Sequence, residues 1–196
     1  MNTVSHVRRA SLALLVFATV ACSDRSSSPM APSEKPVLEI VDPAVNADAL
    51  HRNKPLRTWE WAAVTIGPEG GELTIPAAGL KVKVPEGAVS EPIQFTAIAV
   101  PGDIVAYVFG PHGTTFARPL TVKQSLRETE LFRAKHMPRS LEAGYFADWR
   151  QIDLRNDQVL VNEFLPVTLD VHGAVITFEV EHFSGYMLST GRKGGF

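Results

Sequence analysis

Hydrophobic and polar positions alternate in short runs between residues 58 and 190, and clusters of glycine and proline separate one run from the next. β-Branched and aromatic residues are frequent in these runs, which is typical of strands that bury one face. The runs predict strands at residues 60–66, 72–75, 80–84, 93–100, 104–109, 120–124, 144–148, 159–162, 167–171 and 175–180. Short strands at this spacing, with turn residues between them, predict an all-β antiparallel sandwich or barrel.

One stretch, residues 125–143, interrupts this rhythm. It has no clear alternation, and residues 128–135 have a composition suited to two helical turns. We therefore predict a loop inserted between two strands that carries one short helix.

The first 21 residues have the three parts of a secretory signal peptide. Two arginines precede an apolar run at residues 12–20, which is shorter than the roughly 20 residues that a membrane-spanning helix needs. Residues 19–22, Thr-Val-Ala-Cys, resemble a bacterial lipobox, in which the cysteine is acylated and becomes the mature N-terminus. This resemblance predicts a lipoprotein signal peptide at residues 1–21 and a palmitate-type lipid on Cys22. The alternative is an ordinary signal peptide that is cut nearby, with Cys22 incidental.

Composition also divides the rest of the chain. Serine, proline and charged residues dominate residues 22–57, as is typical of a flexible tether that follows the lipidated cysteine. Residues 37–41 alternate like a strand, so docking of this part onto the domain is the alternative. The β-sandwich is predicted at residues 58–190, and residues 191–196 form a C-terminal tail.

Charge and residue counts exclude several functions. The chain of 196 residues has a formal net charge of −2, and no cluster of lysine or arginine stands in the predicted domain. We therefore predict no nucleic-acid partner. Cys22 is the only cysteine, so the chain has no intramolecular disulfide. His51, His112, His136 and His172 lack the short spacings of a zinc site, and we predict neither a metal nor a cofactor.

The order of several glycine and proline motifs resembles the ZU-five domain, named after zona occludens proteins and Unc-five. The motifs are Gly-Gly-Glu-Leu at residues 70–73, the run at 80–88 and Phe-Gly-Pro-His-Gly-Thr-Thr-Phe at 109–116, followed by Pro119. The resemblance covers residues 62–188. It implies a β-sandwich that is used mainly for protein contacts. The loop at residues 125–143 departs from the pattern.

The residues that follow the last predicted strand are the candidates for chemistry. Strict alternation places His182 and Ser184 on the core face, with Phe183 pointing outward unless a bulge intervenes. His-Phe-Ser resembles the self-cleavage site of ZU-five regions, and the resemblance implies that Ser184 attacks the Phe183 carbonyl while His182 accepts the proton. The alternative, which we favour, is a partly buried histidine hydrogen-bonded to Ser184 or to a loop carbonyl.

The resulting expectation is a non-catalytic protein-interaction module that is lipid-anchored to the inner or outer membrane of a bacterial cell envelope and binds another envelope protein. A self-cleaving domain that breaks the bond between Phe183 and Ser184 is the alternative, and a purely structural role in the envelope is a third. Trp59 and Trp61 alternate with Glu60 at the first predicted strand. Such a pair stacks on carbohydrate or, more commonly, caps a sheet or packs under a linker.

Overall fold

The computed structural model describes residues 44–132, 134–138 and 140–193. The predictions for the signal peptide, for the lipid on Cys22 and for a strand at residues 37–41 lie outside the described residues.

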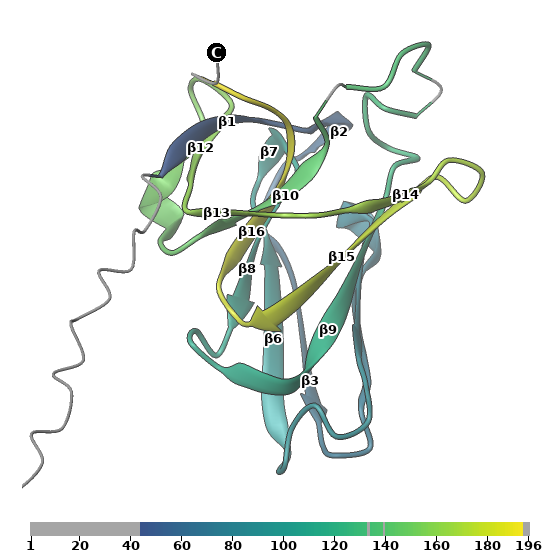
Figure 1. Ribbon diagram of the computed structural model, residues 1–196, viewed down its shortest axis with the longest axis vertical. Coiled ribbons are helices and arrows are strands. Elements are labelled where there is room, and N and C mark those ends of the chain that lie inside the picture. Colours follow the sequence, from purple (N-terminus) through teal and green to yellow (C-terminus); the bar gives the residue numbers. More distant parts are fainter. Residues whose placement is uncertain (1–43, 133, 139, 194–196) are drawn as a thin grey trace, which may run out of the picture. The chain divides into compact units, whose positions relative to one another are not determined.

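The described chain is built almost entirely from antiparallel strands (Figure 1), which confirms the all-β prediction. Two short 3-10 helices, η1 (Pro76–Ala78) and η2 (Trp149–Gln151), are the helical elements of this part. The strands are β1 (Val45–Ala49), β2 (His51–Leu56), β3 (Glu60–Ile66), β4 (Gly71–Ile75), β5 (Leu80–Val84), β6 (Ile93–Ala99), β7 (Gly102–Ile104), β8 (Ala106–Gly110), β9 (Thr115–Ser125), β10 (Glu142–Phe146), β11 (Ile152–Asp153), β12 (Gln158–Val161), β13 (Glu163–Leu165), β14 (Thr168–Asp170), β15 (Val175–His182) and β16 (Gly185–Arg192).

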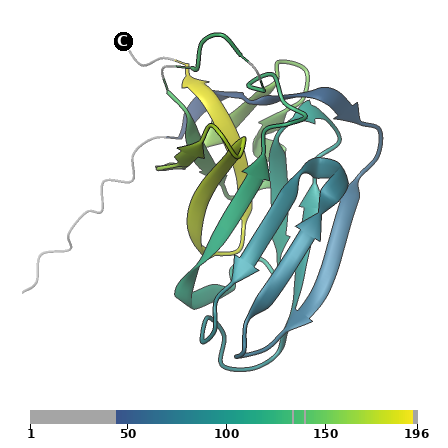
Figure 2. The ribbon, with the colours of Figure 1, turned by 90° about the vertical axis from the view of Figure 1, so that its right-hand side faces the viewer.

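Two sheets pack against each other as a β-sandwich (Figures 1 and 2). One sheet contains the order β3-β6-β8-β16, and the other has the order β14-β15-β9-β5-β4. Alternation decides which side chains enter the core between them: in β5, Leu80, Val82 and Val84 are buried while the two intervening lysines are exposed. From the opposite sheet Phe95 and Phe109 fill the same core. Each fully buried side chain of this size contributes about 1.5–3 kcal/mol of burial free energy.

A second, smaller core lies where the first sheet closes on itself, at the strands labelled in the upper part of Figure 1. β16 pairs with β1 along one edge and with β10 along the other. β10 pairs with β13, and β12, which precedes β13 by a single residue, pairs with β1. Because that single residue joins β12 to β13, strand pairing and the chain itself together form a closed ring of strands. Ala47, Phe146, Val161 and Met187 belong to the buried cluster of this ring.

The ring corrects the expected extent of the tether. Residues 45–56, which composition assigned to the tether, form β1 and β2 instead. The signal was weak because the inward positions of β1 are the small residues Ala47 and Ala49, which are fully or almost fully buried. Residues 191 and 192, assigned to the tail, likewise belong to β16.

The expected helix at residues 128–135 is not formed by the described residues of that segment, which make turns. Pairing with β2 replaces the helix: Asn53 N donates to Glu128 O at 2.7 Å, and Glu130 N donates to His51 O at 3.0 Å. Thr129 is buried between these contacts. Tertiary hydrogen bonds therefore outweigh the modest helical propensity of the segment. No helix among the described residues has the length and apolar character to cross a membrane.

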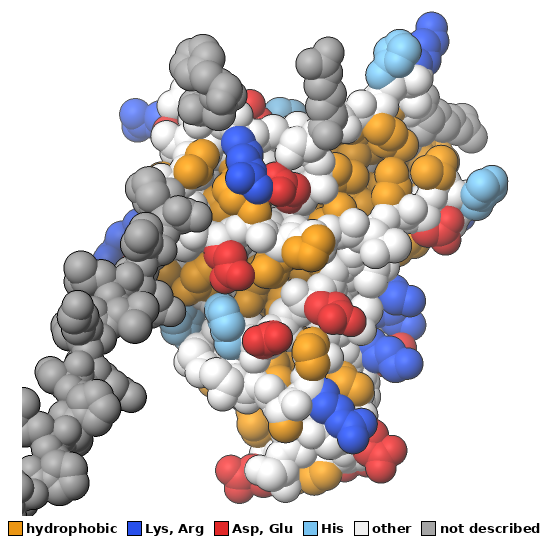
Figure 3. Space-filling model, viewed as in Figure 1, with side chains coloured by type: hydrophobic (Ala, Val, Ile, Leu, Met, Phe, Trp, Pro, Cys, Tyr) orange, Lys and Arg blue, Asp and Glu red, His pale blue; other side chains and the backbone are white. Residues whose placement is uncertain are grey.

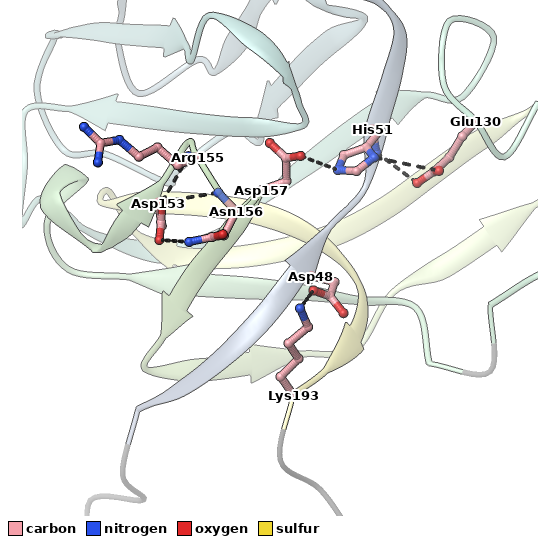
Figure 4. Close-up of polar contacts among 8 residues, drawn as sticks. All are labelled: Asp48, His51, Glu130, Asp153, Arg155, Asn156, Asp157 and Lys193. Carbon is pink, nitrogen blue, oxygen red and sulfur yellow. Dashed lines mark hydrogen bonds and ion pairs between the residues drawn. The ribbon is translucent and has the colours of Figure 1, made fainter.

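Exposed ion pairs join the ends of the ring to its neighbours (Figure 4). Lys193 Nζ lies 3.2 Å from a carboxylate oxygen of Asp48, which connects the residue after β16 to β1. His51 lies between two carboxylates, with its ring nitrogens 4.0 Å from Glu130 and 3.9 Å from Asp157. These contacts hold β1 and the start of β2 against segments that are distant in sequence.

A less exposed pair provides a test of the ring. Arg192 donates to both carboxylate oxygens of Glu142, at 2.9 and 2.6 Å, and its guanidinium lies 4.0 Å from the ring centroid of Phe164. The hydrogen bonds from Arg192, together with one from Ser140, lower the pKa of Glu142. Because the folded pKa is lower than the unfolded one, the pair stabilises the fold above the unfolded pKa of about 4.3 and loses this contribution as the pH falls through the folded pKa.

We expect Glu142→Gln to lower the free energy of unfolding by about 0.5–1 kcal/mol at pH 7, because the bidentate ion pair is replaced by neutral hydrogen bonds. Urea unfolding of the full-length chain at pH 7 and at pH 3 measures this, with exposed Glu91→Gln as the matched control. The difference from wild type should shrink at pH 3. An equal difference at both pH values would contradict the role assigned to the pair.

Candidate functional site

The predicted His-Phe-Ser site lies where the chain passes from β15 to β16, and so from one sheet to the other. Pairing of β15 with β9 is irregular at this end. Val180 pairs with Leu120 and His182 pairs with Thr115. These two neighbouring pairs are therefore two residues apart in β15 but five residues apart in β9. The buried and exposed alternation of β15 breaks at the same place, because His182 is half-buried and Phe183 is buried. This is the bulge on which the predicted orientation of Phe183 depended.

Phe183 is an anchor of the main core and not an outward residue. It is 2% exposed. Its ring meets Phe95 and Phe116 edge-on, with centroids 5.0 and 4.8 Å apart, and lies nearly parallel to Phe109 at 5.6 Å. Aromatic pairs at such distances add to the free energy of burial. The residue before Ser184 therefore has a structural role that requires no chemistry.

Ser184 is also buried, and its hydroxyl contacts a histidine other than His182. Its Oγ donates to the carbonyl of Phe146 at 3.1 Å and lies 3.2 Å from Nε2 of His112. The same Nε2 lies 3.1 Å from the carbonyl of Ala147. The serine thus connects the β15–β16 turn to the end of β10 and to the turn after β8.

His182 faces another direction. Its Nδ1 lies 3.4 Å from the hydroxyl of Tyr186, and that hydroxyl donates to the His182 carbonyl at 2.8 Å. The imidazole meets the ring of Tyr145 edge-on at 5.0 Å. Burial, followed by the nearby Tyr145 and the carboxylates of Glu163 and Glu181, raises the pKa of Tyr186, so its phenol stays neutral and able to donate.

His182 lines a pocket of about 230 Å³, and the pocket is acidic. Glu163, Glu179 and Glu181 contribute to its lining. Figure 3 shows acidic side chains gathered over β13 and β15 on this face. Within the described chain, no group of three histidine, cysteine or acidic side chains converges in a way that could hold a metal ion.

The peptide bond that self-cleavage would break is held on both sides by the loop after β8. Phe183 N donates to Thr114 O at 2.8 Å, and Gly113 N donates to Phe183 O at 2.9 Å. Gly113 has a φ of 79°, in the left-handed region that glycine enters at low cost. Ser184 O accepts a further hydrogen bond from Phe109 N at 2.8 Å. A backbone donor on the Phe183 carbonyl is the kind of group that stabilises an oxyanion.

Other features of the site oppose catalysis. A carbonyl oxygen can only accept, so the bond to Ala147 requires that Nε2 of His112 carry a proton. Since the single Ser184 proton is directed at Phe146, the Ser184 oxygen accepts from His112, which then cannot act as a base. Phe183 and Ser184 are also not among the described residues with positive φ, which apart from glycine are Asp157 and Ala174. The arrangement is a hydrogen-bonded bridge between three loops.

No local pattern in the sequence identifies His112 as the partner of Ser184. The two residues are 72 positions apart, and only the pairing of β15 with β9 and of β16 with β8 brings them together. The tryptophan pair is where the sequence placed it, at the start of β3. Trp59 is 53% exposed and Trp61 is 69% exposed, so neither packs under a neighbouring segment.

Comparison of the chain with protein-family models gave no match, and comparison with curated proteins gave none either. The ZU-five resemblance therefore stays a prediction.

We expect the Ser184 hydroxyl to be coupled to His112 and not to His182. A double-mutant cycle of Ser184→Ala with His112→Ala should give a coupling free energy of about 1 kcal/mol, because each single change removes the hydrogen bond between the buried Ser184 hydroxyl and the exposed imidazole of His112. The matched cycle of Ser184→Ala with His182→Ala should give a coupling within about 0.5 kcal/mol of zero. Urea unfolding of the full-length variants measures both, and the reverse order of couplings would contradict the observed contacts.

Proposed function

We propose that this chain is a lipid-anchored protein of a bacterial envelope whose non-catalytic β-sandwich binds another envelope protein. The observation that carries the proposal is the exposure of Trp59 and Trp61 at an open strand edge. Tryptophan is among the residues that contribute most to binding free energy at protein interfaces. Two such side chains on the surface of a small domain favour a binding role.

The edge itself supports this role. β3 is the last strand of its sheet and pairs only with β6 in the described chain (Figure 2). Its other edge presents backbone N–H and C=O groups on which a partner strand can add. On the outer face Trp61 pairs with Ile98, and Ile98 pairs with Val108, so an apolar row extends from the edge across three strands.

The hydrophobic surface visible in Figure 3 adds to the same proposal. Hydrophobic side chains gather around β14 on that face. Leu165, Val167 and Leu169, from β13, β14 and their connection, are only partly buried there. Apolar surface that remains exposed in a folded domain is typical of a site of association.

The proposed function also includes attachment of the domain to a membrane. We place a lipid on Cys22 and treat the residues between it and β1 as the spacer that separates the domain from the membrane. Two or more acyl chains give stable attachment, because each buried methylene contributes about 0.8 kcal/mol. The ZU-five resemblance, which implies protein contacts, is part of this proposal and agrees with the antiparallel sandwich.

Self-cleavage between Phe183 and Ser184 is the second candidate, favoured by the hydrogen bond from Gly113 N to the Phe183 carbonyl. That reaction requires the other tautomer of His112, with the ring proton on Nδ1 and the bond from Nε2 to the Ala147 carbonyl lost. The Ser184 oxygen would then attack the carbonyl carbon, the hydroxyl proton would pass to Nε2 of His112 and on to the departing Ser184 nitrogen, and water would hydrolyse the resulting ester. Intact mass of the purified chain after several days at neutral pH decides between the candidates. A break before Ser184 that disappears in Ser184→Ala would establish self-cleavage.

A photo-crosslinking amino acid at position 61 should capture a protein partner in the envelope of the native cell. The same amino acid at position 149 is the matched control, because Trp149 is similarly exposed, at 63%, but lies in η2 and not on β3. We expect a discrete adduct from position 61 and none from position 149. Equal adducts from both positions, or none from either, would count against the open edge of β3 as the binding site.

The anchor has its own test. Labelled palmitate should enter the wild-type chain in living bacteria, and Cys22→Ser should abolish both the label and the recovery of the chain in the membrane fraction. Ser23→Ala is the control for a change beside the cysteine that leaves lipidation intact. Membrane recovery of Cys22→Ser at the wild-type level would exclude lipidation as the anchor.

A further inference from the structure

An open groove of about 1150 Å³ lies between β2, η1 and the turns that follow β9. It shares no lining residue with the pocket beside His182. The charged residues of its lining are Arg52, Lys54, Arg57, Glu60, Arg127 and Glu128.

Arg52 is the unusual member of this lining because it is a buried cation. It is 5% exposed. Its guanidinium donates to the carbonyl of Ile104 and to the hydroxyl of Tyr107, but its Nε has no hydrogen-bond partner. Arg52 takes part in none of the ion pairs of the described chain. A buried charge without a counter-charge is costly, so its presence on the wall of a groove indicates a ligand of opposite charge.

The residues around Arg52 hold it in place without neutralising it. The Tyr107 hydroxyl lies between Arg52, Gln124 and the carbonyl of Ala78, and Gln124 Nε2 donates to the same carbonyl at 3.0 Å. Burial raises the pKa of Tyr107, so its phenol is neutral and supplies no negative charge. This buried network fixes the guanidinium of Arg52, a residue of the groove lining, and supplies no negative charge to balance it.

One acidic residue of the adjoining segment, Glu130, is engaged elsewhere. Thr129 forms a β-bridge with Arg52, and Glu130 follows it. Figure 4 shows the Glu130 carboxylate directed at His51, whose backbone N donates to it at 3.1 Å and whose ring lies 4.0 Å away. Glu130 is therefore used to hold His51 and does not reach Arg52.

The rim of the groove adds further positive charge. Lys54, Arg57 and Arg127 line it together with two acidic residues, Glu60 and Glu128. With Arg52 the lining has four cations against two anions, whereas the whole chain is slightly negative. The groove is thus a local region of positive charge, which attracts anionic ligands over a range set by ionic strength.

We propose that this groove binds an acidic peptide segment and that Arg52 pairs with one of its carboxylates. The planar guanidinium matches a carboxylate in geometry and charge. The size favours a peptide over a small anion, because the groove exceeds the roughly 300–1,000 Å³ typical of small-molecule pockets. Apolar residues in the lining, such as Pro55, Leu56 and Ala77, provide contacts for the peptide between its charged side chains.

This inference rests on the proposed function in one respect, since it takes the partner to be a protein, and it specifies the chemistry of the partner segment. It is tested separately with fluorescein-labelled hexaglutamate and the full-length chain in detergent micelles. Fluorescence anisotropy should show saturable binding that weakens as salt is added, and labelled hexaglutamine should not bind.

Three variants locate the site. The double variant Lys54→Gln with Arg127→Gln changes two exposed rim residues and should weaken hexaglutamate binding about tenfold without changing the thermal midpoint. Arg52→Gln should abolish measurable binding. Arg155→Gln, an exposed arginine outside the groove, is the matched control and should bind as wild type does. If Arg52→Gln does not fold, the double variant alone decides the outcome.

Different results would overturn different parts of the proposal. No binding of hexaglutamate to the wild-type chain, or equal binding to the double variant, overturns the site. Displacement of hexaglutamate by inorganic phosphate or free glutamate at matched charge concentration overturns the assignment to a peptide. A crosslinked partner at position 61 together with no hexaglutamate binding would overturn this inference alone, and the converse would overturn the proposed function alone.

Discussion

The fold depends on one strand, β16, that serves two cores at once. Residues 185–189 of this strand are all buried. Tyr186 and Leu188 pack in the core between the two sheets, whereas Met187 packs inside the ring. Both edges of the strand are hydrogen-bonded, to β8 and β1 on one side and to β10 on the other. Period-two alternation therefore assigns its side chains to two different interiors, and neither core can form without the strand.

The same constraint explains why the turn before β16 is so tightly packed. A Cβ at Gly185 would overlap the ring of Phe146, so this position requires glycine for close approach and not for its backbone dihedrals. Phe183 packs in the core between the two sheets. Ser184 donates to the carbonyl of Phe146, a residue of the buried cluster inside the ring of strands. Phe183 and Ser184, the residues on either side of the bond that self-cleavage would break, thus both have structural roles. The hydrogen bond from His112 to Ser184 adds the turn after β8 to this contact between the β15–β16 turn and the end of β10.

Strands that bury one face with large apolar residues could be predicted from the sequence, whereas strands of other kinds could not. Strands with one buried face were well predicted: β3 and β5 have the predicted bounds, 60–66 and 80–84. β16 was missed because a strand buried on both faces shows no alternation. β1 was missed because alanine fills its inward positions, and β2 because it is polar and contains Pro55. The contact between His112 and Ser184, and the burial of Arg52, arise from strand pairing over long sequence distances, so no local pattern encodes them.

β2 and the connection that follows it join the two surfaces that we propose for binding, the groove and the open edge of β3. β2 supplies Arg52 to the groove, and the short connection to β3 supplies Arg57 and Thr58 to its lining. Glu60 belongs to the groove and is also the first residue of β3, so the groove reaches the start of the open edge. Trp59 and Trp61 flank that residue. An extended partner segment that places a carboxylate near Arg52 therefore needs to advance only a few residues, at about 3.4 Å each, to meet the tryptophans and the free hydrogen-bonding groups of β3. Charge would then determine which segment enters, while the strand edge and the aromatic rings would supply most of the contact area.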